Sequence, residues 1–233
     1  FQPRFGALRA GFFSSGVTPN TAQMGAYSVG LGRNPIAGQG AGIGEGAVAI
    51  GDSNQALDDF TVAIGKNNRL GAGNKNAIAI GTDNIVSSRL TGGELTVDLS
   101  LFGHRNTIEG STSGNPRVEM VQMLGVDNKY STHGSGIEKT IIYGIGNTVG
   151  GIGNSVRNGI VIGLDNVDSG DNSIMLSRSS TTLQSATTSV NIGHNNEVRG
   201  TEAVALGVSS IAAGGRSMAF GRDVNVFGDY SVG

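Results

Sequence analysis

A short apolar phrase that ends in glycine and is followed by a polar turn recurs twelve times along the chain. It is clearest in residues 47–51, 61–65, 77–81 and 203–207. The residue closing each phrase is Gly32, Gly51, Gly65, Gly81, Gly103, Gly125, Gly144, Gly163, Ser177, Gly193, Gly207 or Gly221. The base period is 14 residues, and insertions lengthen some gaps. A fixed period of this length predicts a β-solenoid, a class that usually acts through an extended surface rather than a pocket.

Each repeat is numbered here from its closing residue as position zero. Position −1 is apolar in all twelve repeats and position −3 in ten, the exceptions being Ser100 and Gln122. Side chains two residues apart lie on the same side of a strand. Positions −1 and −3 therefore predict one continuous apolar face, and we expect this face to fill the lumen of the solenoid.

Position −2, on the opposite face, is also apolar in every repeat except those with Gly30 and Asn191. A strand that is apolar on both faces is normally buried on both, and a 14-residue coil cannot cover both by itself. An exposed stripe of this length would exceed the apolar patches that monomers tolerate, so position −2 predicts contacts between copies of the chain. The predicted interface residues are Ala49, Ala63, Ala79, Leu101, Met123, Ile142, Val161, Met175, Asn191, Ala205 and Ala219. Three copies of Asn191 are expected to meet in a ring of hydrogen bonds.

The turn after each strand has its own pattern. Glycine at position zero fits a positive φ without a steric penalty. Asparagine at position +3 tolerates left-handed geometry and can bond to its own turn, and stacked amides can also form a ladder. The eight asparagines at this position are Asn54, Asn68, Asn84, Asn106, Asn128, Asn147, Asn166 and Asn196. A second, weaker strand is expected after this turn.

Composition agrees with a folded all-β chain. Of 233 residues 40 are glycine, yet 37% are apolar, too many for a disordered linker. A net charge of −2 without a basic stripe argues against a nucleic-acid partner. No apolar run approaches the ~20 residues of a membrane span, so we expect no direct membrane insertion by this segment. Because the chain opens at Phe1 without methionine, we expect it to be a piece of a longer polypeptide.

Candidate chemistry is sparse. His104 and His194 share turn position +1 but lie several coils apart, so they cannot share a metal ion. Turns such as Gly163-Leu164-Asp165-Asn166 supply one aspartate each, too few for a calcium-binding β-roll. No serine has a nucleophile-elbow sequence. The sequence therefore predicts no catalytic residue, no metal site and no cofactor.

One enzyme class also has stacked Ile-Gly coils, the left-handed hexapeptide-repeat acyltransferases. Their coils contain three hexapeptides, so the spacings between closing residues would be multiples of six. None of the eleven spacings here is a multiple of six. The acyltransferase remains an alternative that the spacing disfavours, and a purely structural surface spacer is a second alternative.

The phrase Ala47-Val48-Ala49-Ile50-Gly51, followed by Asn54 and repeated every 14 residues, resembles the YadA-like head repeat of bacterial trimeric autotransporter adhesins. The resemblance implies a left-handed parallel β-roll of about twelve coils that assembles as a homotrimer. It also implies display at the bacterial cell surface, anchored to the outer membrane through segments outside this chain. The implied function is attachment to host cells, through a receptor or an extracellular matrix protein. We expect residues 1–24 to form an N-terminal cap and residues 25–233 to form the head.

Insertions gather in four consecutive coils between residues 82 and 162, in the stretches 87–98, 109–119, 129–139 and 150–158. Since loops on a rigid scaffold often carry recognition, these stretches are the predicted ligand-binding region. Drift in tolerant turns is the alternative explanation. The candidate ligand-binding residues are Arg89, Glu94, Glu109, Arg117, Lys129, Tyr130, His133 and Arg157.

Overall fold

The computed structural model describes residues 6–13, 24–38, 44–71, 73–87, 98–109, 117–131, 137–150 and 158–233. The side chains of residues 117–119 and 137–138 are outside this description. The chain forms two compact units, Phe1–Gly110 (unit 1) and Ser111–Gly233 (unit 2). The described residues form strands and turns, with no helix among them.

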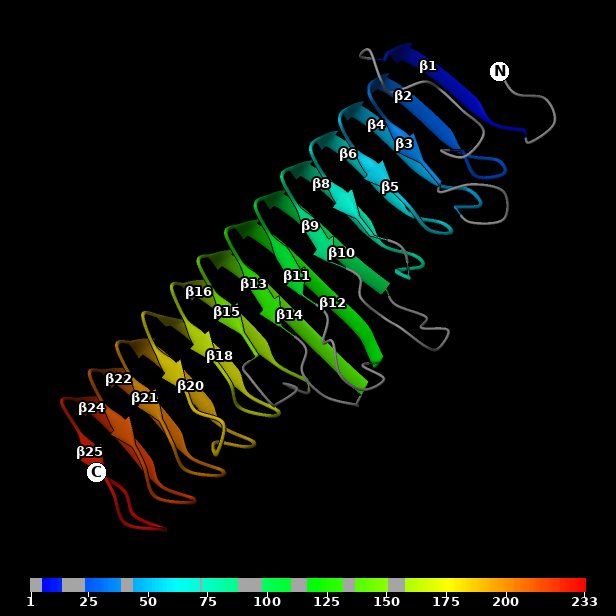
Figure 1. Cartoon of the computed structure of the whole chain (residues 1–233). Helices are drawn as coiled ribbons and strands as arrows, with labels where there is room; N and C mark the ends of the chain where they lie inside the picture. The colour runs from blue at the N-terminus through cyan, green and yellow to red at the C-terminus, as the bar shows by residue number, and fades with distance from the viewer. Residues whose placement is uncertain are drawn as a thin grey trace. The chain divides into compact units, whose positions relative to one another are not determined.

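Unit 1 consists of two parallel sheets whose strands alternate along the chain (Figure 1). The strands of its first sheet are, in order, β1 (Leu8–Phe12), β2 (Val29–Arg33), β4 (Val48–Asp52), β6 (Val62–Lys66), β8 (Ile78–Thr82) and β10 (Asp98–His104). The shorter strands of its second sheet are β3 (Ile36–Ala37), β5 (Gln55–Ala56), β7 (Arg69–Leu70), β9 (Ile85–Ser87) and β11 (Thr107–Glu109). Each coil therefore contributes one strand to each sheet.

Unit 2 repeats this arrangement. Its first sheet contains β12 (Arg117–Val126), β14 (Ile137–Ile145), β16 (Ile160–Leu164), β18 (Ile174–Arg178), β20 (Val190–His194), β22 (Val204–Val208) and β24 (Met218–Arg222). Its second sheet contains β13 (Lys129–Ser131), β15 (Thr148–Val149), β17 (Val167–Asp168), β19 (Thr181–Thr182), β21 (Glu197–Val198), β23 (Ile211–Ala212) and β25 (Asn225–Val226). The predicted all-β solenoid of parallel strands is confirmed in both units.

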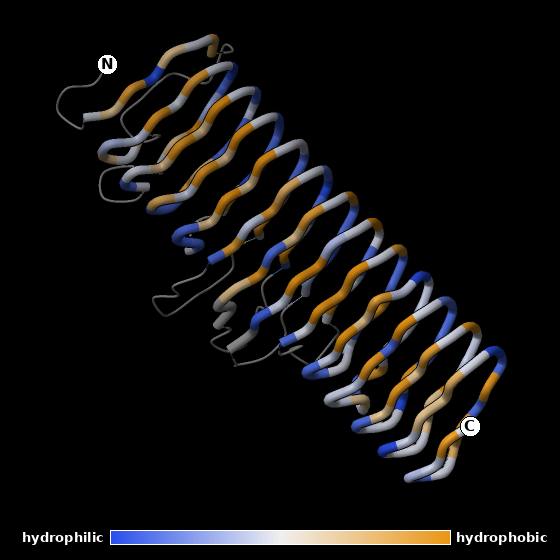
Figure 2. The backbone as a smooth tube through the Cα atoms, turned by 180° about the vertical axis from the view of Figure 1, so that it is seen from behind, coloured by the Kyte–Doolittle hydropathy of each residue, from blue (hydrophilic) through white to orange (hydrophobic). Residues whose placement is uncertain are grey.

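Equivalent repeat positions pair across neighbouring coils. Ile50 pairs with Ile64 and Gly51 with Gly65 in unit 1, and Gly207 pairs with Gly221 in unit 2. The glycines at position zero have φ between 115° and 143°, as expected for a sharp exit from the strand. Hydrophobic residues concentrate in the strands and hydrophilic ones at the turns (Figure 2).

The asparagines at position +3 form the predicted ladders. In unit 1, Asn68 Nδ2 donates to Asn54 Oδ1 at 3.0 Å, and Asn84 Nδ2 donates to Asn68 Oδ1 at 2.9 Å. In unit 2, Asn147 Nδ2 donates to Asn128 Oδ1 at 3.0 Å. One detail was wrong, because the left-handed residue of the turn is at position +2, as at Ser53 with φ 56°. The buried amide is the next residue, and it satisfies backbone carbonyls as well as its neighbour in the ladder.

Ser177 is the one closing residue that is not glycine, and it occurs together with a change at position +3. A Cβ on Gly163 would lie 2.8 Å from Asn166 Nδ2 of the same coil. After Ser177 the residue at position +3 is Ser180, whose shorter side chain removes this conflict. The Ser177 hydroxyl donates to Asn166 Oδ1 at 2.9 Å, and Ser180 N donates to the same oxygen at 3.1 Å. The two serines therefore continue the ladder without the asparagine.

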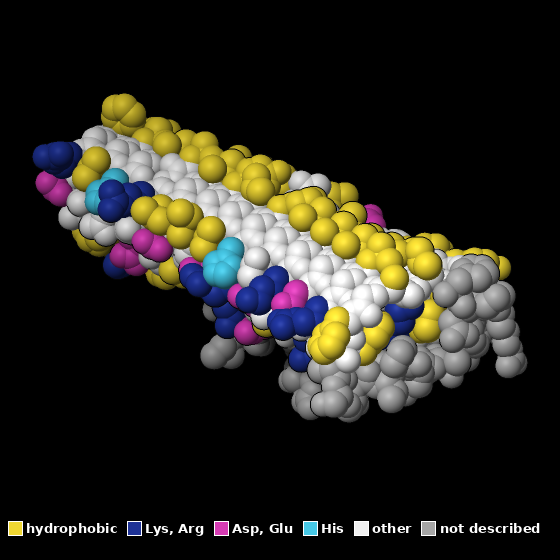
Figure 3. All heavy atoms as spheres, turned by 90° about the horizontal axis from the view of Figure 1, so that it is seen from above, with side chains coloured by type: hydrophobic (Ala, Val, Ile, Leu, Met, Phe, Trp, Pro, Cys, Tyr) yellow, Lys and Arg dark blue, Asp and Glu magenta, His cyan; other side chains and the backbone are white. Residues whose placement is uncertain are grey.

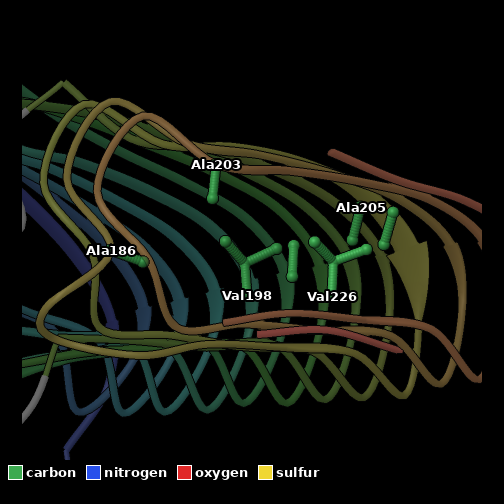
Figure 4. Close-up of a cluster of buried hydrophobic side chains, with 7 residues drawn as sticks. Ala186, Val198, Ala203, Ala205 and Val226 are labelled. Atoms are coloured by element: carbon green, nitrogen blue, oxygen red, sulfur yellow. The ribbon is translucent and has the colours of Figure 1, made fainter. Parts of the chain in front are cut away.

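The assignment of the two strand faces was wrong. Position −2 lies inside the roll, where Ala49, Ala63 and Ala205 are completely buried within a single chain. In unit 2 these side chains meet the second sheet, so that Ala205 shares one apolar cluster with Val198 and Val226 (Figure 4). Position −4, as at Ala203, is buried with them. The lumen side chains range in size from Ala49 and Ala205 to Met123 and Tyr130.

Residues Leu8–Phe12, within the predicted cap, form β1 and pair in register with β2, with Gly11 opposite Gly32. Gly11 has φ 136°, like the closing glycines of later coils. The first two dozen residues therefore include a further strand of the repeat. The role of residues 1–24 as a cap stays a prediction.

Candidate interaction surfaces

Positions −1 and −3 lie on the outside of the roll, and here they are called the outer stripe of each unit. In unit 1 the stripe includes Ile80 and Phe102, each 38% exposed. In unit 2 it includes Leu124, which is 50% exposed, and Phe220, which is 65% exposed. Rows of hydrophobic side chains are visible on the surface in Figure 3. The outer stripes are the extended apolar surfaces that the single chain leaves uncovered.

The eleven residues predicted to form contacts between chains are therefore lumen residues. All of them are 0–1% exposed in the single chain, where they contact their own second sheet rather than a neighbouring copy. Both strand faces are apolar and the roll covers only one of them. Contact between chains therefore stays a prediction, and the face to which it applies is the outer stripe.

Asn191 was predicted to lie between chains, but it too is a lumen residue. It is completely buried in the lumen, and its Nδ2 donates to the backbone oxygen of Thr181 on β19 at 3.1 Å. Among the described residues, Asn191 Oδ1 has no hydrogen-bond partner. A ring of three Asn191 side chains from three copies is excluded by this position, since the amide is enclosed in its own coil.

The predicted ligand-binding residues differ in burial, and several of them lie outside the described residues. Tyr130 is wrong as a surface residue, because it is completely buried on β13 and is the largest fully buried side chain described. Lys129, beside it, is exposed, and Glu109 at the end of β11 is half-buried. Arg89, Glu94, His133 and Arg157 lie outside the described residues, as does the side chain of Arg117. The insertion loops therefore stay a prediction.

Asp168 is a lumen residue that the repeat pattern did not single out. It stands at position +5, on β17, and is completely buried. The equivalent residues of the other coils are uncharged, and the neighbours in register are Val149 and Thr182. Gly170 N donates to Asp168 Oδ1 at 3.1 Å, and the Ser173 hydroxyl donates to Asp168 Oδ2. A search for charged residues at inward positions of the weaker strand would have found it.

The pKa of Asp168 is raised to about 6, chiefly because the ionised carboxylate is costly inside the roll and to a smaller extent because of the nearby charge of Asp171. The hydrogen bonds from Ser173 and Gly170 oppose this shift. The folded chain thus holds the proton up to a pH of about 6, whereas an unfolded chain releases it near pH 4. Between these values folding binds a proton, so the free energy of unfolding falls as the pH rises through this window.

We expect Asp168→Asn to remove a pH dependence of the unfolding free energy on the order of 3 kcal/mol between about pH 4 and 6. Urea unfolding followed by circular dichroism at several pH values measures it. Asp165→Asn is the matched control, since Asp165 is an exposed carboxyl three residues away. The assignment fails if Asp168→Asn keeps the wild-type slope.

No group of three or more histidine, aspartate or glutamate side chains placed to hold a metal ion occurs among the residues with described positions. His104 and His194 lie at separate turns, and His104 Nε2 is 2.8 Å from Arg105 Nη1. Within the described ranges there is also no helix long and apolar enough to cross a membrane.

Comparison with known families identifies the repeat. The YadA head domain repeat matches twice, over residues 43–68 and 199–223. The chain contains YadA head domain repeats. The first YadA repeat match holds β4, β5 and β6, and the second holds β22, β23 and β24. A search of curated proteins found no match.

YadA head repeats belong to trimeric autotransporter adhesins, an adhesin family rather than an enzyme family. In these proteins the heads are exposed at the surface of cells that anchor them in an outer membrane. In both matched segments the two closing residues are 14 residues apart, Gly51 and Gly65 in the first and Gly207 and Gly221 in the second. Their outer stripes carry Ile50 and Ile64 in unit 1 and Leu206 and Phe220 in unit 2.

Proposed function

We propose that this chain is the head of a homotrimeric surface adhesin that attaches a bacterium to host cells or to extracellular matrix proteins. The observation that carries the proposal is the outer stripe, an uncovered apolar sheet face on a roll built from YadA head repeats. Such a face calls for a partner surface of the same extent. A second and third copy of the same chain, aligned side by side, supply that surface coil by coil.

The outer face of the second sheet is more polar than the outer stripe. This difference supports a trimer that assembles through the outer stripes and binds its ligand through other surfaces. In unit 2 five of its seven outward residues are polar, the residues being Lys129, Thr148, Val167, Thr181, Glu197, Ile211 and Asn225. A mostly polar face of this kind is free to meet other molecules when the outer stripes are covered. The homotrimer would then present three copies of each polar surface.

The insertion loops between residues 82 and 162 are the proposed ligand-binding region. They leave a rigid scaffold of parallel strands in consecutive coils. Arg89, Glu94, Glu109, Arg117, Lys129, His133 and Arg157 are the side chains offered for contact, and buried Tyr130 is no longer among them. Three copies in one trimer allow weak single contacts to add through avidity.

The experiment combines assembly and adhesion. We expect light scattering of the purified chain to give the mass of three copies, and the trimer to bind cultured cells or immobilised matrix proteins. Shortening the loops within residues 87–98, 109–119 and 129–139 toward the 14-residue period, while keeping strand residues such as buried Tyr130, is expected to keep the trimer and reduce adhesion at least tenfold. The proposed contacts are then removed while the outer stripes remain.

The control is a chain in which residues 88–97, 110–116 and 132–136, which lie between the strands, keep their number but have a scrambled order. It is expected to assemble and to lose adhesion as well. If the variant with shortened loops adheres as well as the parent chain, the loops are not the ligand-binding region. A trimer that adheres to no cell and no matrix protein would instead support a surface spacer, and a stable monomer would refute the assembly.

A further inference from the structure

In eleven coils one corner has a left-handed backbone at position −5, four residues before the −1 side chain. The coils that close at Gly103, Gly125 and Gly144 have strand residues at this position instead. The residues there have φ between 52° and 64°: Gly6, Tyr27, Gly46, Phe60, Asn76, Asn158, Asn172, Thr188, Glu202, Arg216 and Tyr230. Glycine and asparagine adopt this conformation at least cost, whereas a bulky residue with positive φ is an outlier. The corner is therefore a place where large side chains need an explanation.

Three of these corner residues are aromatic, and all three are exposed to solvent. Tyr27 is 68% exposed and Phe60 58% in unit 1, and Tyr230 is 73% exposed in unit 2. Burial does not offset the backbone strain of these residues, because most of each ring is in water. Strain that the fold does not require is characteristic of functional positions.

In unit 1 each ring lies against a glycine corner of the preceding coil, Tyr27 against Gly6 and Phe60 against Gly46. The corners are stacked by backbone hydrogen bonds, from Gly46 N to Ala26 O and from Phe60 N to Glu45 O, each 2.8 Å long. A Cβ on Gly46 would come within 3.0 Å of Phe60 Cδ1, so the ring lies against the bare backbone of the preceding coil. Tyr27 and Phe60 are two coils apart, which separates their attachment points by about 10 Å.

In unit 2 the same corner carries a hollow of about 270 Å³. Its lining residues are Thr201, Glu202, Gly215, Arg216, Asp229 and Tyr230. Arg216 orders them, since its Nε donates to Glu202 Oε2 at 2.8 Å and its Nη1 to the Tyr230 hydroxyl at 2.6 Å. The guanidinium also lies 5.3 Å from the centre of the Tyr230 ring, which fixes the ring in place.

The chemistry of the hollow selects its ligand. An aromatic face attracts the weakly positive C–H groups of a sugar ring, while the carboxylates of Glu202 and Asp229 accept hydrogen bonds from hydroxyl groups. Two carboxylates and one guanidinium line the hollow, so its charge disfavours an acidic ligand. A neutral saccharide has both features, an apolar ring face and several hydroxyl donors.

We propose that the hollow around Tyr230 binds a neutral saccharide, and that Tyr27 and Phe60 form a second stacking surface for the same class of ligand in unit 1. This site goes beyond the proposed attachment to proteins and does not depend on it. The saccharide contacts the corner edge of the roll, whereas assembly uses the outer stripe and the proposed protein ligand uses the loops.

Asparagine substitutions separate a binding role from a structural one. Tyr230→Asn, Tyr27→Asn and Phe60→Asn each remove a ring while placing a residue that suits the left-handed corner. The triple variant is expected to have an unchanged or higher melting temperature and at least tenfold weaker saccharide binding. Thr188→Asn is the matched control, because it makes the same change at the same corner of a coil without a ring, and it should bind as the parent does.

Binding is measured on the full chain by saturation-transfer NMR and calorimetry, with chitotetraose and cellotetraose as neutral probes and a heparin tetrasaccharide as the acidic probe. Saturable binding of a neutral probe, lost in the triple variant but kept in Thr188→Asn, supports the site. No saturable binding of either neutral probe, equal binding by the triple variant, or binding of heparin alone overturns it. A triple variant that melts at a lower temperature and binds normally identifies the rings as structural. Failure of cell adhesion leaves all these readouts intact, so the two proposals fail separately.

Discussion

Ala205→Asp is expected to unfold unit 2, because it places a carboxylate inside the roll with no charged partner. Ala205 is completely buried between the two sheets and contacts the cluster that contains Val198 and Val226. An unpaired buried charge costs about 3–5 kcal/mol, a large share of the stability of most domains. Urea unfolding followed by circular dichroism should show a lost or strongly shifted transition.

Leu206→Asp is the matched control, since it changes the next residue along the same strand. Leu206 belongs to the outer stripe, so its charge is expected to leave the fold of the single chain intact and to weaken the proposed trimer. Circular dichroism and light scattering together distinguish the two results. If Ala205→Asp were to fold normally and dissociate the assembly, the face assignment described above would be reversed.

Gly65→Ala is expected to destabilise unit 1 by about 2–3 kcal/mol or more. Gly65 has φ 119°, a conformation that side chains with a Cβ rarely adopt. A Cβ there would also lie only 2.0 Å from the carbonyl oxygen of Gly81 in the next coil. Since that oxygen belongs to the backbone of the adjacent strand, the coils would have to separate. Chemical unfolding of the variant measures the loss.

Gly30→Ala provides the comparison within the same unit. Gly30 is at position −2, where the adjacent coil has Ala49, and the nearest atom to an added Cβ would be 3.5 Å away. We expect this change to be neutral or to stabilise by up to about 1 kcal/mol, because it restricts the unfolded chain. Equal losses from both substitutions would show that the cost comes from losing glycine in general and not from the closing turn.

Hydrogen bonding along the turns followed directly from the residues in the sequence. Asn68 and Asn84 recur at position +3 because each amide can satisfy backbone carbonyls and the next amide at once. The exception at Ser177 and Ser180 needed the structure, because it depends on the space between two side chains of one coil. Nothing in the periodicity shows that a Cβ at position zero and an amide at position +3 compete for that space.

The candidate surfaces also have some features that the sequence predicts and others that only the structure shows. The rings of Tyr27, Phe60 and Tyr230 share position −5, but the sequence alone does not show that this position is a left-handed corner open to water. The burial of Tyr130 follows from the repeat, because it stands at position +5 in register with Val149. It was assigned to the surface because it lies next to an insertion. Asp168 was overlooked because the strand that carries it is only two residues long.

By itself the sequence determined the period, the parallel strands, the glycine turns and the apolar character of both strand faces. These are local or repeating properties. Each depends on backbone preferences or on the alternation of side chains between the two strand faces, which recurs in every coil. Only the tertiary structure decided which apolar face is inside. Both faces of the strand are hydrophobic, so hydropathy could not choose between them. The direction in which each coil turns made the choice, because the second sheet packs against position −2 and leaves positions −1 and −3 outside.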